Sequence, residues 1–105
     1  LFWQATQMPK ARYTVFCHLV DGQGRLVAQF DGEPVGGTAP TTGWQANATV
    51  IDRRPGELPP DLAAGTYTLR VGLYPWPDLT RLAVQNTALP VVDNAVAVTA
   101  VEVAR

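Results

Sequence analysis

Apolar and polar residues alternate with a period of two along much of the chain. In the run TYTLRVGLY, residues 66–74, Tyr67, Leu69, Val71 and Leu73 fall on one side. Successive residues of a β-strand point to opposite faces of a sheet, so this side is predicted to be core. Turn-forming glycines and prolines recur about every ten residues, as in all-β sandwiches. The predicted strands cover residues 1–6, 12–20, 25–31, 48–53, 66–74, 81–85 and 95–103, of which 81–85 is the weakest.

The connections between these strands also favour an all-β protein. A long irregular stretch covers residues 32–46, and a proline-rich connection covers 55–65. Nine glycines and nine prolines among 105 residues would interrupt most helices of useful length. We therefore expect one domain over residues 1–105, an Ig-like antiparallel β-sandwich of about seven strands. The opening LFWQAT resembles the middle of a strand, so we expect an excised or N-terminally trimmed part of a longer chain.

The stretch HLVDGQGRLVAQFDG, residues 18–32, predicts a β-hairpin. Its turn, DGQG, contains two glycines, and glycine adopts the positive φ of tight hairpin turns without steric cost. Alternation then divides the side chains between two faces. The predicted core face carries Val15, Cys17, Leu19, Leu26, Ala28 and Phe30. The opposite face carries Phe16, His18, Val20, Val27, Gln29 and Asp31.

Two further local features are informative. The run DLAAGTY, ending at Tyr67, resembles a tyrosine corner, in which the phenol bonds to nearby backbone. Cys17 lies in an apolar run, where a buried small hydrophobe is expected, and a single cysteine excludes an internal disulfide or a multi-cysteine zinc site.

Composition and charge narrow the function. Hydrophobic residues make up 47% and the net charge is −1, which is typical of a globular domain. The eight basic residues form no patch, so no nucleic-acid partner is expected. Arg53 and Arg54 are expected to be solvated, one of them pairing with Asp52 or Asp61.

The polar row His18, Gln29 and Asp31 has two interpretations. A histidine beside a carboxylate can act as a general base or a metal ligand. However, a metal site needs about three protein ligands, and the chain has one histidine and no serine for a nucleophile elbow. We therefore favour a cross-strand polar cluster that contacts a ligand, with no catalytic residue, metal or cofactor. A small hydrolase or metal enzyme using His18 and Asp31 is the competing hypothesis.

Aromatic side chains near the strand ends extend this candidate site. Exposed aromatic rings on a β-sandwich can stack on a sugar ring, although each tryptophan could instead close one end of the sandwich. The candidate ligand-binding residues are His18, Gln29, Asp31, Trp44, Arg70, Tyr74 and Trp76.

Several longer stretches carry a resemblance to a known family. The stretches are LFWQAT, YTVFCHLVD, GRLVAQFDGEPVGGTAPTTGW and LPPDLAAGTYTLRVGLY, which together span about residues 1–75. They resemble the C-terminal extracytoplasmic β-sandwich domain of bacterial membrane proteins similar to dolichyl-phosphate-mannose-type glycosyltransferases. Residues 76–105 match it only as a generic closing strand.

The resemblance implies a non-catalytic role, because the catalytic machinery of such proteins belongs to their membrane part. It implies an accessory domain on the extracytoplasmic side of a bacterial membrane, which contacts its parent membrane domain and binds a glycan or lipid-linked sugar. The alternative is a structural spacer or protein-interaction module without a small-molecule ligand, because exposed sheet edges can accept a partner's strand. The sequence defines no oligomeric state.

Overall fold

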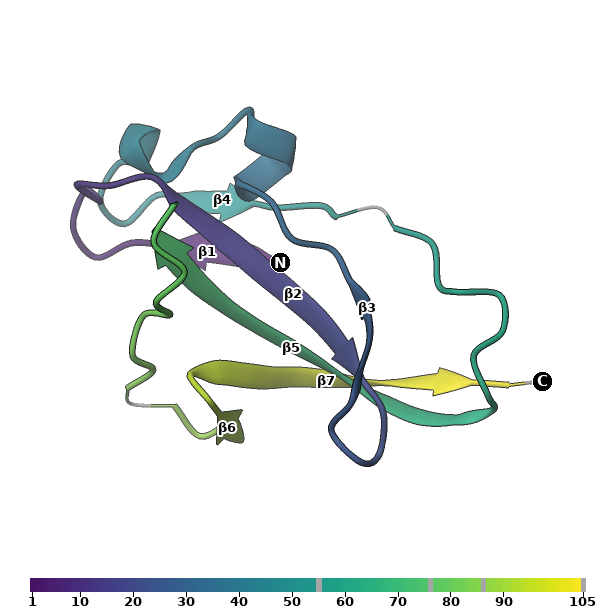
Figure 1. The fold of residues 1–105 in the computed structure, drawn as a ribbon. Helices are drawn as coiled ribbons and strands as arrows, with labels where there is room; N and C mark the ends of the chain where they lie inside the picture. Colours follow the sequence, from purple (N-terminus) through teal and green to yellow (C-terminus); the bar gives the residue numbers. More distant parts are fainter. Residues whose placement is uncertain (55, 76, 86, 105) are drawn as a thin grey trace.

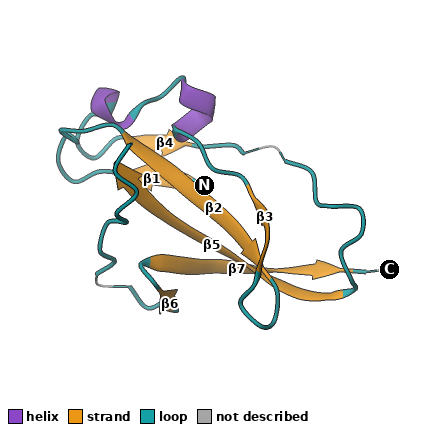
Figure 2. Ribbon diagram, viewed as in Figure 1, coloured by secondary structure: helices purple, strands orange, loops and turns teal. Residues whose placement is uncertain are grey.

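The computed structural model describes residues 1–54, 56–75, 77–85 and 87–104, and these residues form an all-β fold (Figures 1 and 2). Two short 3₁₀ turns lie between the third and fourth strands, η1 (Pro34–Gly37) and η2 (Thr41–Gly43). The strands are β1 (Phe2–Gln4), β2 (Tyr13–Val20), β3 (Leu26–Gln29), β4 (Thr49–Ile51), β5 (Gly65–Pro75), β6 (Val91–Val92) and β7 (Ala95–Val103).

The strands form two antiparallel sheets, which confirms the all-β prediction. The larger sheet has five strands in the order β3-β2-β5-β7-β6, and the smaller one pairs β1 with β4. The central pair, β2 and β5, is in register over eight residues, from Tyr13 opposite Pro75 to Val20 opposite Thr68. This long pairing carries most of the core and positions the polar residues discussed below.

The inner face of the larger sheet, which is the face toward β1 and β4, has the predicted core. Val15, Cys17 and Leu19 of β2 are at most 4% exposed, and Tyr67 of β5 is 6% exposed. The Tyr67 hydroxyl donates a hydrogen bond of 2.7 Å to the Ala63 carbonyl, so the predicted tyrosine corner is confirmed. The prediction that Cys17 is a buried small hydrophobe is also confirmed.

The outer face of the larger sheet is buried around Phe16. Phe16 is 1% exposed and lies opposite Gly72 of β5. A Cβ atom at Gly72 would lie 2.2 Å from the Phe16 ring and 2.8 Å from the Asn94 carbonyl oxygen, so only glycine fits there. The guanidinium carbon of Arg81 covers the same ring, 4.2 Å from its centroid. The β2 strand is therefore enclosed on both faces at this point.

The β2–β3 hairpin forms as predicted, with one error in its faces. The Asp21 carboxylate accepts hydrogen bonds from the Gln23 and Arg25 amides, both at 2.9 Å, and Gly24 has a φ of 80°. However, the register shifts beside Leu19, so that Val20 pairs with Leu26. The extra residue of this bulge moves Leu26 off the inner face. Leu26 is 50% exposed, and its prediction as a core residue was wrong.

The predicted strand over residues 81–85 is also wrong. Residues 77–85 instead form an irregular segment beside the end of β5, where the Leu82 amide bonds to the Leu73 carbonyl at 2.8 Å. The following strand is the two-residue β6, joined to β7 by Asp93 and Asn94, which have φ values of 51° and 56°. Asp and Asn tolerate the left-handed conformation that a two-residue hairpin turn requires. At the other end, β1 is shorter than the predicted strand 1–6.

A buried polar cluster joins the two sheets. The Asp52 side chain is 0% exposed and accepts hydrogen bonds from the Trp3 indole at 3.0 Å, the Val35 amide at 2.9 Å and Arg54 at 2.9 and 2.7 Å. Arg54 also donates to the carbonyls of Phe30 and Gly32 at 3.1 and 3.0 Å. The expectation that Arg54 is solvated was therefore wrong, whereas the expected pairing of one of the two arginines with Asp52 is confirmed.

Burial alone raises the pKa of Asp52, but hydrogen bonds from Val35, Arg54 and Trp3 outweigh it. The pKa of Asp52 consequently lies below its usual range. The cluster thus holds a charged carboxylate inside the protein at neutral pH.

Candidate ligand-binding site

A shallow hollow of about 220 Å³ on the outer face of the larger sheet gathers most of the predicted polar residues. We call it the outer pocket. It is lined by Phe16, His18, Gln29, Asp31, Tyr74, Leu79 and Arg81. Four of the seven predicted ligand-binding residues therefore lie together in one hollow.

The strand register explains why these residues meet. His18 of β2 lies opposite Gln29 of β3 on one side and opposite Arg70 of β5 on the other. Residues directly opposite in antiparallel strands share a face, so the three side chains form one row across the sheet. Asp31 follows the end of β3, one residue before the bridge between Gly32 and Val15. The row predicted from alternation is therefore present.

Asp31 connects this row to the backbone of β2. Its Oδ1 atom accepts a hydrogen bond from the Cys17 amide at 3.0 Å and lies 3.5 Å from His18 Nε2. The expected ladder partner of the Cys17 amide is the Phe30 carbonyl, which instead accepts from Arg54 at 3.1 Å, and the Asp31 carboxylate takes its place as acceptor. One carboxylate oxygen of Asp31 is thus engaged by the backbone of β2, while 29% of the side chain remains exposed.

Tyr74 and Arg81 form the opposite rim of the outer pocket. The Tyr74 ring lies nearly parallel to that of Phe16, with centroids 6.4 Å apart and an interplanar angle of 24°. Arg81 donates to the Asp93 carbonyl at 2.9 Å, which fixes its side chain above Phe16. Sequence reasoning missed Arg81 and Leu79. Their position depends on residues 77–85 folding back along β5, and no local motif indicates that path.

The remaining predicted site residues lie elsewhere. Arg70 shares the row with His18 but lines a neighbouring hollow with Pro90, Val92 and Ala97, among other residues. Its Nε atom is buried and has no hydrogen-bond partner within the described ranges. Trp44 is 7% exposed and donates to the Ala39 carbonyl at 2.9 Å, away from the row. Trp76 lies outside the described residues.

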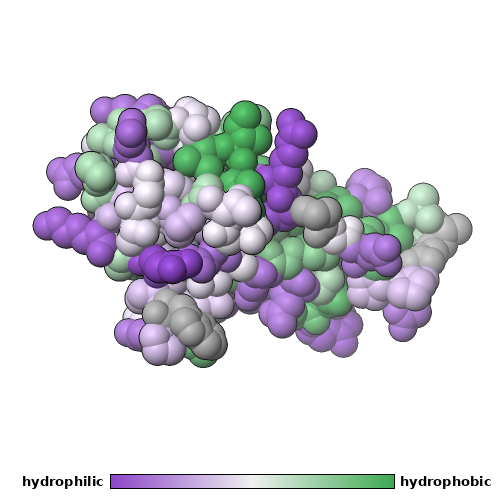
Figure 3. Space-filling model, turned by 90° about the horizontal axis from the view of Figure 1, so that it is seen from above, coloured by the Kyte–Doolittle hydropathy of each residue, from purple (hydrophilic) through white to green (hydrophobic). Residues whose placement is uncertain are grey.

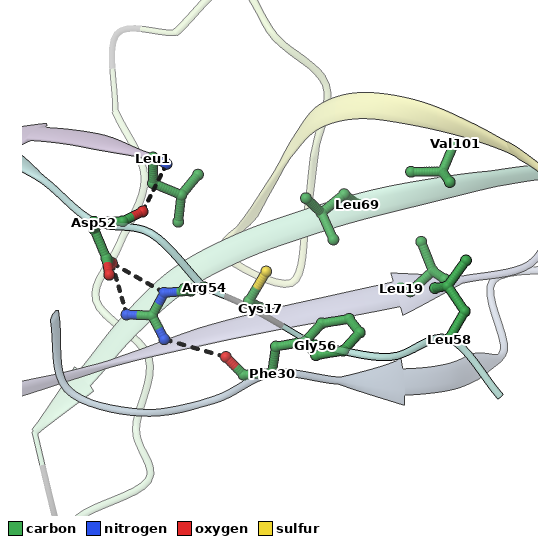
Figure 4. A pocket seen from close by; sticks show the side chains of 10 residues that line it. All are labelled: Leu1, Cys17, Leu19, Phe30, Asp52, Arg54, Gly56, Leu58, Leu69 and Val101. Carbon is green, nitrogen blue, oxygen red and sulfur yellow. Dashed lines mark hydrogen bonds and ion pairs between the residues drawn. The ribbon is translucent and has the colours of Figure 1, made fainter. Parts of the chain in front are cut away.

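A second hollow, the inner cavity, lies between the inner face of the larger sheet and the chain around Leu1, Arg54 and Leu58 (Figure 4). Its volume is about 320 Å³, and Asp52 and Arg54 occupy one end while aliphatic side chains occupy the other. These two charged groups bond to each other and Arg54 also bonds to the backbone, so their hydrogen bonds are made within the protein and not to a ligand. Its lining residues are Leu1, Cys17, Leu19, Phe30, Asp52, Arg54, Gly56, Leu58, Leu69 and Val101.

Neither hollow has the residues of a metal site or a reactive thiol. In the part of the chain that the structure describes, no three His, Cys, Asp or Glu side chains gather closely enough for a metal ion. Burial raises the pKa of the Cys17 thiol, so its nucleophilic thiolate form is disfavoured at neutral pH. What the outer pocket offers is a set of hydrogen-bond donors and acceptors around an aromatic wall.

Exposed apolar residues are scattered over the remaining surface. Figure 3 shows hydrophobic areas interrupted by hydrophilic side chains on one face of the molecule. Within the described residues, no helix has the length and apolar character needed to cross a membrane. Comparison with protein families, curated proteins and solved structures finds no match to this chain.

Proposed function

We propose that the chain is a non-catalytic binding domain that holds one ring of a carbohydrate in the outer pocket. The observation that carries this proposal is the convergence of mixed hydrogen-bonding groups with an aromatic wall in a single hollow. The Gln29 amide both donates and accepts, Asp31 accepts, and Arg81 donates. A sugar ring presents hydroxyls that both donate and accept, together with apolar C–H faces, and this combination matches that set.

Tyr74 supports the choice of a carbohydrate over an inorganic ion. Its ring is held beside Phe16 and forms a wall of the outer pocket. A partly apolar ligand gains from contact with such a ring, because aromatic side chains bury large area at low entropic cost. The volume of about 220 Å³ is below the ~300–1,000 Å³ of pockets for drug-sized ligands, so one ring of a longer glycan is the fitting size.

The wider setting of this proposal rests on the sequence resemblance. We infer an Ig-like sandwich that serves as the accessory domain of a membrane glycosyltransferase-like protein, on the extracytoplasmic side of a bacterial membrane. The ligand would then be a glycan or the sugar of a lipid-linked donor. Two antiparallel sheets and a tyrosine corner at the start of β5 support the sandwich part of this inference.

Nuclear magnetic resonance tests the proposal directly. The ¹⁵N-labelled chain is titrated with a panel of neutral, acidic and amino sugars and short glycans, and amide shifts are followed. For at least one sugar we expect saturable shifts at His18, Gln29 and Tyr74, with millimolar affinity because the hollow is shallow. Gln29→Ala should weaken that affinity about tenfold, since a hydrogen bond matched to the ligand contributes ~1–1.5 kcal/mol.

A matched control is Gln45→Ala, which lies by a different hollow beside Trp44 and should leave the affinity unchanged. A flat response across the whole panel, or equal losses in both variants, would refute the carbohydrate proposal.

A protein-interaction module without a small-molecule ligand is the second candidate function. The observation that favours it is the long β7 strand, most of whose outer edge has no partner strand within the described residues. Shifts confined to β7 upon addition of a protein partner, with none in the outer pocket upon addition of sugars, would favour this candidate over the first.

A further inference from the structure

The β7 strand has a long open edge. It pairs with β5 from Val96 to Val103 on one side. On the other side, within the described residues, β6 pairs with Ala95 and Val96, and the Ala97 amide donates to the Pro90 carbonyl at 2.9 Å, which leaves the edge open from Val98 onward. Figure 1 shows β6 beside the start of β7 only, with the rest of the strand running free toward the C-terminus. An edge of this kind presents unpaired backbone N–H and C=O groups to any strand that approaches.

The open segment has few of the features with which proteins protect an edge. The register of β7 with β5 shifts at Val98, which forms a bulge, but residues 99–103 beyond it, TAVEV, contain one charged residue and no proline. The opposite edge of the same sheet is the four-residue β3, which carries a bulge at its junction with the hairpin turn. Short, bulged edges resist further pairing, whereas long, weakly charged edges favour it. The two edges of this sheet are therefore unequal, and β7 is the one suited to pairing.

We propose that β7 pairs antiparallel with β7 of a second copy of this chain, which joins two five-stranded sheets across a two-fold axis. The segment is complementary to itself. With Val101 opposite Val101 of the second copy, Val103 lies opposite Thr99 and Glu102 lies opposite Ala100. All of these pairs join residues on the same face, because Leu69, which lines the inner cavity, is opposite Thr99, and the alternating residues Val101 and Val103 follow it on that face.

Charge restricts the register of this pairing. A shift by one step toward the C-terminus would place Glu102 opposite Glu102, and like charges directly opposite destabilise a strand pair. A shift by one step the other way, with Ala100 opposite Ala100, avoids that conflict. Two-fold pairing uses the open edge of both copies, so assembly stops at the dimer.

The inner face of the sheet also suits a second copy as the partner. In the dimer the inner faces continue across the axis, so Val101 of both copies extends the aliphatic wall that Leu69 begins. An interface of about five residues per copy is small relative to the ~1,200–2,000 Å² of stable complexes. We therefore expect a weak dimer whose population rises with concentration.

Sedimentation equilibrium of the 105-residue chain from about 10 μM to 1 mM tests the proposal. The expected result is a monomer–dimer equilibrium with a dissociation constant in the micromolar to millimolar range. Ala100→Glu brings like charges together in both registers, opposite Glu102 of the second copy in the first and opposite the same residue of the second copy in the second, and it should raise that constant at least tenfold. Gln29→Glu makes the same change of charge on the opposite edge and should leave it unchanged. Melting temperatures establish that both variants fold.

Disulfide trapping provides a second measurement that does not depend on dissociation. Cys17 is 4% exposed, so a cysteine introduced at the surface is the reactive one. Val101→Cys should form an intermolecular disulfide upon oxidation in the first register and Ala100→Cys in the second, whereas Gln29→Cys should form none. A monomer at every concentration, assembly beyond the dimer, or trapping through Gln29→Cys would each overturn the proposal.

Discussion

Substitution of Asp52 by asparagine should remove a large part of the stability of this fold. The asparagine side chain keeps the size of the aspartate and one carbonyl oxygen, but it replaces the second acceptor with an NH₂ group. The NH₂ group would meet a donor in either orientation, because the Val35 amide donates to Asp52 Oδ1 and the Trp3 indole and the Arg54 guanidinium donate to Oδ2. Arg54 is 12% exposed and would lose its counter-ion while remaining inside the protein.

The magnitude follows from the burial of the pair. Removal of one partner of a buried ion pair costs about 3–5 kcal/mol, because the other charge is left uncompensated. Unfolding entropy scales with length, and for a chain of 105 residues it is ~0.2 kcal/mol/K near the melting temperature. The melting temperature of Asp52→Asn should therefore fall by roughly 14–23 °C.

The assay is urea unfolding at neutral pH, followed by circular dichroism and repeated for Arg54→Met and for the double variant. Because the two side chains interact directly, the losses of the single variants should together exceed that of the double variant by at least about 2 kcal/mol. A loss below about 1 kcal/mol for Asp52→Asn, or additive losses within about 0.5 kcal/mol, would refute the reasoning.

The pH dependence of the same pair provides an independent check. The pKa of Asp52 is lowered in the folded state, so the unfolded state takes up a proton first as the pH falls. The advantage of the natural chain over Asp52→Asn should be complete above the ordinary aspartate pKa of ~3.9 and should shrink below it. An advantage that stays constant down to about pH 2 would contradict the assignment.

Three smaller predictions concern individual contacts. Tyr67→Phe should lower the free energy of unfolding by about 1 kcal/mol, since the Ala63 carbonyl loses its donor; an unchanged urea midpoint would contradict the corner's role. Gly72→Ala should cost about 1–3 kcal/mol through its clash with the Phe16 ring, whereas Gly22→Ala, with no atom within 4 Å, should change stability by less than about 0.5 kcal/mol. Leu26→Thr should also change the free energy of unfolding by less than about 0.5 kcal/mol, because Leu26 is half exposed. A larger loss would indicate that Leu26 is a core residue.

Alternation along the sequence was sufficient to predict the inner face and the polar row. A strand that pairs on both sides keeps the two-residue period, so the faces of β2 and β5 follow directly from the order of their residues. Leu26 was misplaced because one extra residue in a bulge reverses the faces beyond it, and the glycines of the turn do not reveal where that residue lies.

The parts that could not be predicted depend on contacts between distant segments. Charge alone suggested that Arg54 is solvated, but Phe30 and Gly32 supply carbonyls to it from 24 and 22 residues away. The spacing of Asp52 and Arg54, two apart in an extended segment, was the one local indication that they share a face. Likewise, Arg81 reaches the outer pocket only because its segment bonds to Leu73 and to the β6–β7 turn.

The outer pocket and the β7 edge occupy different parts of the same sheet, so the two proposals can be separated by experiment. In the strand order β3-β2-β5-β7-β6, the pocket lies over β3, β2 and the end of β5, while pairing would occur at β7.

A two-fold axis perpendicular to the joined sheet would place both outer pockets on one face. A surface that displays many copies of the ligand would then be bound by two sites at once, and effective concentration would strengthen that binding. Ala100→Glu should therefore leave the affinity for a free sugar unchanged but weaken binding to a densely coated surface by about tenfold or more in surface plasmon resonance. Gln29→Ala should weaken both the free-sugar affinity and the binding to the surface. Equal binding of the natural chain and Ala100→Glu to the dense surface would show that the dimer does not couple the two pockets.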